Sequence, residues 1–234
     1  MADRYQVTSS NGQGDARRVK DLCISLRFMT SGPRLLKDVP FVVFDLETSG
    51  AAPSTGAAVT EIGAVKVLGG EIIGEFQSFV DPGHYLSEFI TSLTGITDAM
   101  LFGAPTIDQV LPTFLDFIGS HNETVLVAHN SPFDMSFMRA AAAAHSYHWP
   151  EYKVIDTARV ARYVLDRDEV PNCKLSTLAP FFGSPTSPNH RALDDARATV
   201  DVLHGIFERL GSHDVTTLED LIQFKRKRQR RPID

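Results

Sequence analysis

The chain has 234 residues, of which 43% are hydrophobic and 22% are charged, so it can build one globular domain with a substantial core. Its apolar stretches are too short to span a bilayer, and its polar start lacks the apolar segment of a secretory signal, so we expect no membrane partner. Two cysteines, Cys23 and Cys173, suit neither a disulfide framework nor a zinc cluster. We therefore expect a cytoplasmic protein.

The net charge of −6 is unevenly distributed along the chain. Residues 225–231, KRKRQRR, hold six of the 23 basic residues, and residues 1–37 hold seven more against three acids. The stretch 38–224 is left with ten basic and 25 acidic residues. An acidic body suits cation binding and basic arms suit a polyanion, although a solvated, disordered tail is an equal alternative.

The first half of the chain predicts an arm followed by a strand meander. Residues 1–37 are polar at first, and 19–29 has the pattern of a short helix or strand that packs on the body. A buried strand is expected over 41–46. Alternating apolar and polar residues on both sides of a Gly-Gly pair predict a hairpin with strands near 58–67 and 71–80.

The second half alternates strands with helices. Strands are expected over 124–130 and 152–157, and helices over 107–117, 131–145, 157–165, 174–183, 190–211 and 215–224. Ser131 is the expected cap of its helix, with Pro132 at the first helical position, and Gly211 suits the end of the long helix. The order predicts an α/β domain with a mixed sheet. We divide the chain into a partly ordered arm (1–37), a main domain (38–212) and a C-terminal helix with its basic tail (213–234).

Two carboxylates lie at the end of the first buried strand. Asp45 and Glu47 are two residues apart, so both side chains project from one face of the strand. Burying two like charges together is costly unless a cation lies between them. A strand end that reaches solvent is the simpler alternative. Ligand sites at the carboxyl ends of strands in open α/β sheets favour the functional interpretation.

Asp134 has two interpretations as well. The pattern Ser-x-x-Asp in SPFD is typical of a helix N-terminus, where an acid complements the helix dipole. The same helix follows the strand at 124–130, so Asp134 also lies at a carboxyl edge of the sheet. If that strand is parallel to the first one, Asp134 emerges beside Asp45 and Glu47.

The long helix begins with the adjacent acids Asp194 and Asp195. At about 100° per residue, Asp195 lies on the flank of the apolar stripe and Asp194 points further toward water. His190 stands just before the helix, where a surface or capping role is the alternative. Together these positions offer four carboxylates and a histidine without a thiolate, a set that suits Mg²⁺ or Mn²⁺ better than zinc.

Three motifs in order then identify a resemblance. The chain resembles the DEDDh 3′–5′ exonucleases, especially those of the proofreading epsilon-subunit type, from about residue 39 to 210. The motifs are FDLETSG, VAHNSPFDMSFM and HRALDDARAT, and LTGITDAML and KLSTLAPFFG resemble lesser landmarks of the family. Thr94 departs from the pattern, since many members have histidine before Gly-Ile.

The resemblance implies an RNase H-like mixed five-stranded sheet flanked by helices. It also implies two divalent cations, Mg²⁺ or Mn²⁺, bound by Asp45, Glu47, Asp134 and Asp195, with His190 as general base. Contacts to the terminal nucleotide are expected from Thr48, Leu93, Thr94, Ile96, Asn130 and Phe133. Phe133 would stack on or wedge beside a base, with packing of its own helix as the alternative.

The implied function is metal-dependent removal of nucleotides from the 3′ end of single-stranded or frayed nucleic acid. DNA is the expected substrate, in proofreading or repair, with a DNA polymerase as a possible partner. RNA trimming and a non-catalytic nucleic-acid scaffold are the alternatives. A phosphate cradle at GAAPSTGAA is disfavoured because the loop lacks the Lys-Ser/Thr of a P-loop.

Overall fold

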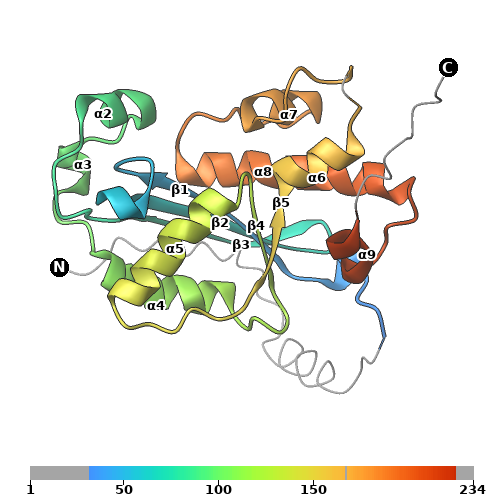
Figure 1. Cartoon of the computed structure of the whole chain (residues 1–234), viewed down its shortest axis with the longest axis horizontal. Coiled ribbons are helices and arrows are strands. Elements are labelled where there is room, and N and C mark those ends of the chain that lie inside the picture. The colour runs from blue at the N-terminus through green and yellow to red at the C-terminus, as the bar shows by residue number, and fades with distance from the viewer. Residues whose placement is uncertain (1–31, 167, 225–234) are drawn as a thin grey trace, which may run out of the picture.

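A mixed five-stranded sheet forms the centre of the protein, as the computed structural model shows for residues 32–166 and 168–224. The strand order is β3-β2-β1-β4-β5, with β2 and β3 antiparallel to their neighbours and β4 and β5 parallel to β1 (Figure 1). The strands are β1 Phe41–Thr48, β2 Val59–Leu68, β3 Glu71–Phe79, β4 Val125–Ala128 and β5 Lys153–Asp156. The predicted α/β class, the mixed sheet and the hairpin are confirmed.

Helices cover both faces of this sheet. Those in the described residues are α2 Glu88–Thr94, α3 Asp98–Leu101, α4 Ile107–Ile118, α5 Pro132–Ala144, α6 Thr157–Val164, α7 Leu175–Phe181, α8 Ala192–Gly211 and α9 Leu218–Gln223, with 3₁₀ turns η1 Leu36–Asp38 and η2 Pro53–Thr55. Buried residues of α6, α7, α8 and α9 form one core cluster with the sheet, and those of α4 and α5 form another. No helix in the described part of the chain combines the length and apolar character that a membrane crossing requires.

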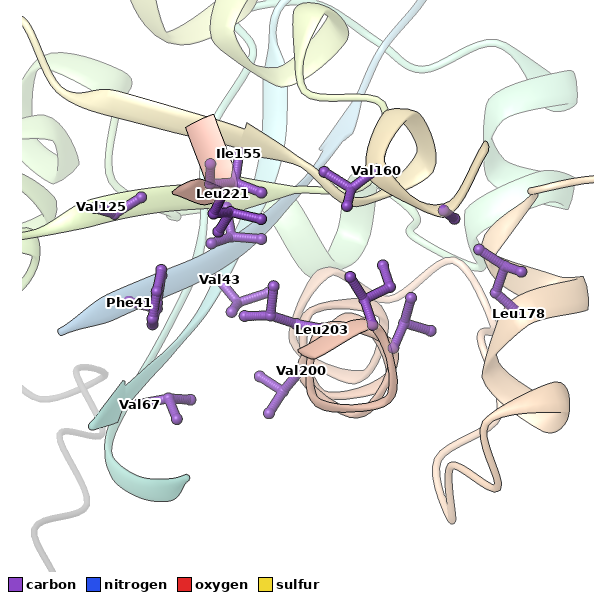
Figure 2. Packing of buried hydrophobic residues seen from close by; sticks show 14 of the residues in the cluster. Phe41, Val43, Val67, Val125, Ile155, Val160, Leu178, Val200, Leu203 and Leu221 are labelled. Carbon is purple, nitrogen blue, oxygen red and sulfur yellow. The ribbon is translucent and has the colours of Figure 1, made fainter. Parts of the chain in front are cut away.

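The central strand β1 is buried on both faces, and this alternation sets the direction of its carboxylates. Phe41 and Val43 pack in the cluster that contains Val200 and Leu203 of α8 (Figure 2). Val42, Phe44 and Leu46 belong to the opposite cluster, with α4 and α5. Because side chains alternate along a strand, Asp45 and Glu47 project from the α8 face of the sheet.

Several local expectations change in the structure. β1 continues to Thr48, two residues beyond the predicted end at 46, so Glu47 lies within the strand together with Asp45. Ser131 occupies the cap position of α5, but its side chain makes no capping hydrogen bond. Gly211 is the last residue of α8 and does not have the left-handed conformation of a glycine stop.

Two short helices, α2 and α3, lie in a stretch for which no element was predicted. Ser87 caps α2 by accepting from the N–H of Ile90, and Thr97 caps α3 by accepting from the N–H of Met100. At the other end of the chain, Leu218 and Leu221 of α9 join the α8-side core. The segment 19–29 and the basic residues 225–231 lie outside the described residues.

Candidate active site

The first two predicted ligands come from β1. In the antiparallel pairing with β2, Asp45 lies opposite Gly63 and Glu47 lies opposite Glu61. Asp45 is half-buried and Glu47 is buried. The register shifts after Glu47, which marks an irregularity in the ladder at the edge of the site.

A glycine on β2 lets the long helix approach this pair. A Cβ atom built on Gly63 would lie 2.1 Å from the backbone nitrogen of Leu193 and 2.2 Å from the carbonyl carbon of Ala192. No side chain fits there, so the first turn of α8 rests directly on the backbone of β2. This close approach brings the N-terminus of α8 over the carboxylates of β1.

The two adjacent aspartates of α8 face different surroundings, as the helix geometry predicts. Asp195 is buried, and its Oδ1 accepts a hydrogen bond from the backbone N–H of Asn189 at 2.9 Å. Asp194 is half-exposed and pairs with Arg197 at 3.2 Å. His190 is exposed and lines the same cavity as Asp195. Its φ of 59° is uncommon for a residue other than glycine.

Asp134 is directed at β1. Its Oδ1 accepts a hydrogen bond from the backbone N–H of Leu46 at 3.2 Å, between the two β1 carboxylates in sequence. The side chain is 2% exposed. This contact across 88 positions shows that Asp134 does more than complement its own helix. The expected convergence of β1 and the start of α5 is therefore present.

The cluster is electrostatically strained. Burial, followed by the charges of Asp134, Asp195 and Glu47, raises the pKa of Asp45 well above its usual value. Burial and then Asp195 raise the pKa of Glu47 to about 8. Burial also raises the pKa of Asp134 to about 8 and raises that of Asp195. Carboxylates that resist ionisation together gain most from a bound cation.

The donor set fits a divalent metal. Glu47, His190 and Asp195 each offer one ligand atom, and these atoms lie within 4.8 Å of one another. Carboxylate oxygens dominate the cluster, and a thiolate is absent from this three-residue group, which suits Mg²⁺ or Mn²⁺. The arrangement is thus a possible acidic metal site at Glu47 and Asp195.

The acidic cluster and His190 line a cavity of about 570 Å³. Of the residues predicted to contact the terminal nucleotide, Thr48, Leu93, Thr94 and Phe133 line it. Ile96 and Asn130 are not among the lining residues: Ile96 is fully buried, and Asn130 is exposed. Thr94 is buried, and its hydroxyl donates to the Ile90 carbonyl at 3.0 Å.

Sequence reasoning did not assign a role to His129, which also lines the cavity. Its Nε2 donates to the Cys173 carbonyl at 3.0 Å, and its Nδ1 is 2.9 Å from the Thr157 hydroxyl. Burial lowers its pKa. Both ring nitrogens of His129 are engaged, so His129 has a structural role in the cavity wall. Of the two histidines that line this cavity, His190 is the exposed one. The position of His129 directly after a buried strand could have indicated that it lies at the carboxyl edge of the sheet, beside the site.

Three further residues near the site, Phe89, Glu61 and Arg191, also received no role in the sequence analysis. Phe89 lines the cavity and is 72% exposed, and the helix that carries it was not predicted. Glu61 is completely buried opposite Glu47 and pairs with Arg191 at 2.9 Å. An acid in a hairpin strand is ordinarily a solvent-facing residue, so only its pairing with the ligand strand could have identified Glu61.

The sequence matches known exonucleases. The RNase T family model, described as an exonuclease, matches residues 42–203. A putative bifunctional exonuclease/endonuclease of Mycobacterium tuberculosis is 52% identical over 192 residues, which cover 80% of this chain and 29% of that protein. A PolC-type DNA polymerase III of Clostridium perfringens is 41% identical over 187 residues, or 78% of this chain and 12% of that protein. The chain thus spans less than a third of either relative.

Solved structures share the fold. Exonuclease X in complex with 5′ overhanging duplex DNA has a TM-score of 0.55 at 24% identity and covers 77% of this chain and 96% of its own. The nuclease domain of 3′hExo, a DEDDh family member bound to rAMP, has a TM-score of 0.61 at 22% identity, with 74% and 94% coverage. E. coli Exonuclease I with a dT13 oligonucleotide reaches 0.65 at 17% identity, with 76% and 43% coverage. The family match extends over residues 42–203, most of the described part of the chain, and the mixed sheet is the fold of these nucleases, so this chain belongs to the RNase T exonuclease family.

Proposed function

We propose that this chain removes nucleotides from the 3′ end of single-stranded or frayed DNA, with two divalent cations and His190 as general base. The observation that carries the proposal is the convergence of Glu47 from β1 with His190 and Asp195 at the start of α8. Their ligand atoms lie within 4.8 Å of one another, although the residues are far apart in the sequence. Such a convergence of carboxylate and imidazole ligands supports metal-assisted hydrolysis of a phosphodiester.

The proposed metal ligands are Asp45, Glu47, Asp134 and Asp195. Two divalent cations, when bound, stabilise the attacking and leaving oxygens of a phosphodiester. One oxygen of Asp195 is held by the Asn189 N–H, which leaves the other for a cation. One oxygen of Asp134 is likewise held by Leu46. These backbone contacts fix the carboxylates before any ligand arrives, which favours a preorganised site.

His190 has the position that a general base needs. It is exposed at the rim of the cavity, where water enters, and it adjoins two of the proposed ligands. A neutral imidazole there can accept the proton of the attacking water. His129, with both ring nitrogens hydrogen-bonded, is not available for this role.

The substrate end of the cavity suits one terminal nucleotide and its neighbour. Its volume of about 570 Å³ is typical of a pocket for a ligand of that size. Leu93 and Phe133 supply apolar surface beside the acids, against which a base can pack. With ten basic and 25 acidic residues between 38 and 224, the body disfavours a long run of phosphate contacts. We therefore propose engagement of a short single-stranded end, with a minor role in binding for Ile96 and Asn130.

The relatives named as PolC-type DNA polymerase III favour DNA over RNA as the substrate and a DNA polymerase as a partner. The exonuclease domain in this proposal spans residues 38–212 of a cytoplasmic protein. Residues 213–234 and the arm 1–37 lie outside the catalytic unit, and their basic charge suits an accessory contact with nucleic acid.

A degradation panel tests the proposal. Purified protein is incubated with 5′-labelled single-stranded DNA, matched duplex, duplex with a mismatched 3′ end, and single-stranded RNA of the same sequence. Each reaction contains Mn²⁺, Mg²⁺ or EDTA. We expect a ladder that shortens from the 3′ end, fastest for single-stranded and mismatched DNA, and no cleavage in EDTA.

Two results would contradict this proposal. Faster degradation of RNA than of DNA would replace it with an RNA-trimming function. Binding of the oligonucleotides without hydrolysis in Mn²⁺ would indicate the non-catalytic scaffold.

A further inference from the structure

Glu61 is an acid that the proposed mechanism does not use, yet it is completely buried beside the site. Its carboxylate accepts four hydrogen bonds. Oε1 accepts from the Arg191 guanidinium at 2.9 Å and from the Gln77 amide at 2.8 Å. Oε2 accepts from the Nε of Arg191 and from the backbone N–H of Ala192, both at 3.1 Å. A carboxylate with such a set of donors is fixed in position.

Three of the four donors to Glu61 belong to the two residues that follow His190. Arg191 is held through its side chain and Ala192 through its backbone, so Glu61 secures the start of α8 at the point where the chain leaves His190. The Arg191 guanidinium also lies over the Phe79 ring, 5.3 Å from its centroid. Because Glu61 is paired with Glu47 across β1 and β2, this anchor is tied to the strand of the proposed ligands.

The other side of His190 is anchored to the proposed ligand on α8. The backbone N–H of Asn189 donates to Asp195 at 2.9 Å, and the Asn189 side-chain oxygen accepts from the N–H of Arg191 at 3.1 Å. His190 thus lies between two fixed residues, in a conformation with φ of 59°. Among the hydrogen bonds of the described residues, none fixes its imidazole ring. The ring is therefore positioned by the backbone on either side.

We propose that Glu61 and Arg191 are positioning residues of the exonuclease, whose two-point pair sets His190 and Asp195 against the carboxylates of β1. This inference rests on the proposed roles of His190 and Asp195. The pair joins β2 to the start of α8, so its loss would release both residues from the cluster together. The reaction would slow because the proposed base and a proposed ligand would both move, and a cation would bind less tightly because Asp195 is one of its proposed ligands.

The protein contains a matched control in a second pair. Arg197 and Glu75 also make two hydrogen bonds, both at 2.8 Å, between α8 and the sheet. This pair is partly exposed and lies further along α8, on β3 instead of β2. Neither residue lines the cavity. Its loss removes a comparable contact between helix and sheet without touching His190.

The test compares E61Q and R191K with E75Q and R197K in the full chain. R191K keeps the charge but cannot make two parallel bonds to a carboxylate, so it separates geometry from charge. The Arg191 side chain is 33% exposed, so we expect R191K to disturb the fold less than E61Q, which alters a completely buried carboxylate. For each variant we measure kcat and KM on single-stranded DNA, the Kd of Mn²⁺ without substrate by electron paramagnetic resonance, and Tm.

We expect E61Q and R191K to lower kcat and to weaken Mn²⁺ binding by about 10- to 100-fold, with a small change in KM. E75Q and R197K should lower Tm, while their kcat and their Kd for Mn²⁺ stay within about fivefold of the wild type. Wild-type kcat and Mn²⁺ affinity in R191K would overturn the inference, as would equal losses in the Glu75 and Arg197 variants. A wild-type protein that neither cleaves DNA nor binds Mn²⁺ would overturn the proposed function as well.

Discussion

Asp134 on α5 and Leu46 on β1 are joined by a hydrogen bond from the Leu46 backbone N–H to the Asp134 carboxylate, at 3.2 Å. The contact connects the start of α5 to the carboxyl-terminal part of β1, and both residues are buried. A buried N–H needs an acceptor, so Asp134 serves the fold as well as the proposed metal site. These two duties can be separated by substitution.

Asp134→Asn should keep the fold and lose the activity, because asparagine retains an oxygen for the Leu46 N–H but carries no charge. Asp134→Ala should in addition leave that N–H unpaired, at a cost of about 1–3 kcal/mol in the free energy of unfolding. Urea denaturation and the degradation assay measure the two effects. Equal stability of the two variants would show that the hydrogen bond is unimportant.

Substitution of the two adjacent acids of α8 should affect the activity differently. Asp195→Asn should lower kcat/KM by at least about 100-fold, which is more than residues beyond the metal ligands usually cost. Asp194→Asn should change it by no more than about fivefold, because its half-exposed pair with Arg197 contributes at most about 1 kcal/mol. The 3′-degradation assay decides. Loss of activity in Asp194→Asn alone would refute the assignment of faces on α8.

His190→Ala separates a base from a metal ligand. As the general base, His190 should contribute about 10²- to 10⁴-fold to kcat, and its removal should leave the Kd of Mn²⁺ nearly unchanged. His148→Ala, in the exposed loop before β5, is the control and should behave as wild type. A large rise in the Kd of Mn²⁺ for His190→Ala would instead identify His190 as a ligand, which its distance to Glu47 and Asp195 also permits.

The stability of the metal-free protein should fall as the pH rises. Glu47 has a pKa of about 8 in the fold and 4.5 ordinarily, and that of Asp134 is also about 8. Between about pH 4.5 and pH 8, Glu47 and Asp134 stay protonated in the folded protein but lose their protons in the unfolded chain. The unfolded state therefore gains stability relative to the folded state as the pH rises. Below about pH 4.5 both states are protonated, and above about pH 8 both are ionised.

Thermal melts in EDTA and in Mn²⁺ check this pH dependence. The Tm in EDTA should be lower at pH 8 than at pH 6, and Mn²⁺ should raise it more at pH 8, because cations bind the ionised carboxylates. Control melts of Asp195→Asn should show a smaller response to Mn²⁺. A Tm in EDTA that rises from pH 6 to pH 8 would contradict the assigned pKa shifts.

Gly63→Ala should damage both stability and activity. The new Cβ atom would meet the Leu193 nitrogen at 2.1 Å, so α8 must move away from β2, at a cost of about 1–3 kcal/mol. Gly74→Ala on β3 is the control, since its Cβ meets only the Phe117 ring edge at 3.4 Å. Denaturation curves and kcat of both variants give the answer. Full activity in Gly63→Ala would show that the close approach is not required.

The sequence predicted the direction of a side chain correctly wherever the periodicity of its own strand or helix determines that direction. Alternation along β1 correctly directs Asp45 and Glu47 to one face, and helical periodicity correctly separates Asp195 from Asp194. Both arguments depend on local geometry that the buried positions of the structure reproduce. The order of strands and helices was sufficient to predict the mixed sheet for the same reason.

The missed features depend on partners that are distant in sequence. Glu61 acts through Arg191, 130 positions away, and no local pattern indicates such a pair. α2 and α3 contain seven and four residues, too short to be stable without tertiary packing. Ser131 fits the capping pattern, but its backbone already has helical angles, with φ of −48° and ψ of −27°, and its side chain makes no capping hydrogen bond.

The position of α8 in the chain determines when the nuclease becomes complete. On the proposed ligand set, β1 and α5 contribute three acids early, and the fourth arrives only with Asp195. During synthesis, a ribosome-bound chain that ends before α8 can form hairpins and early helices but has no finished centre for cleavage. On the proposed ligand set, we therefore expect cleavage of nucleic acid only after most of the domain has emerged.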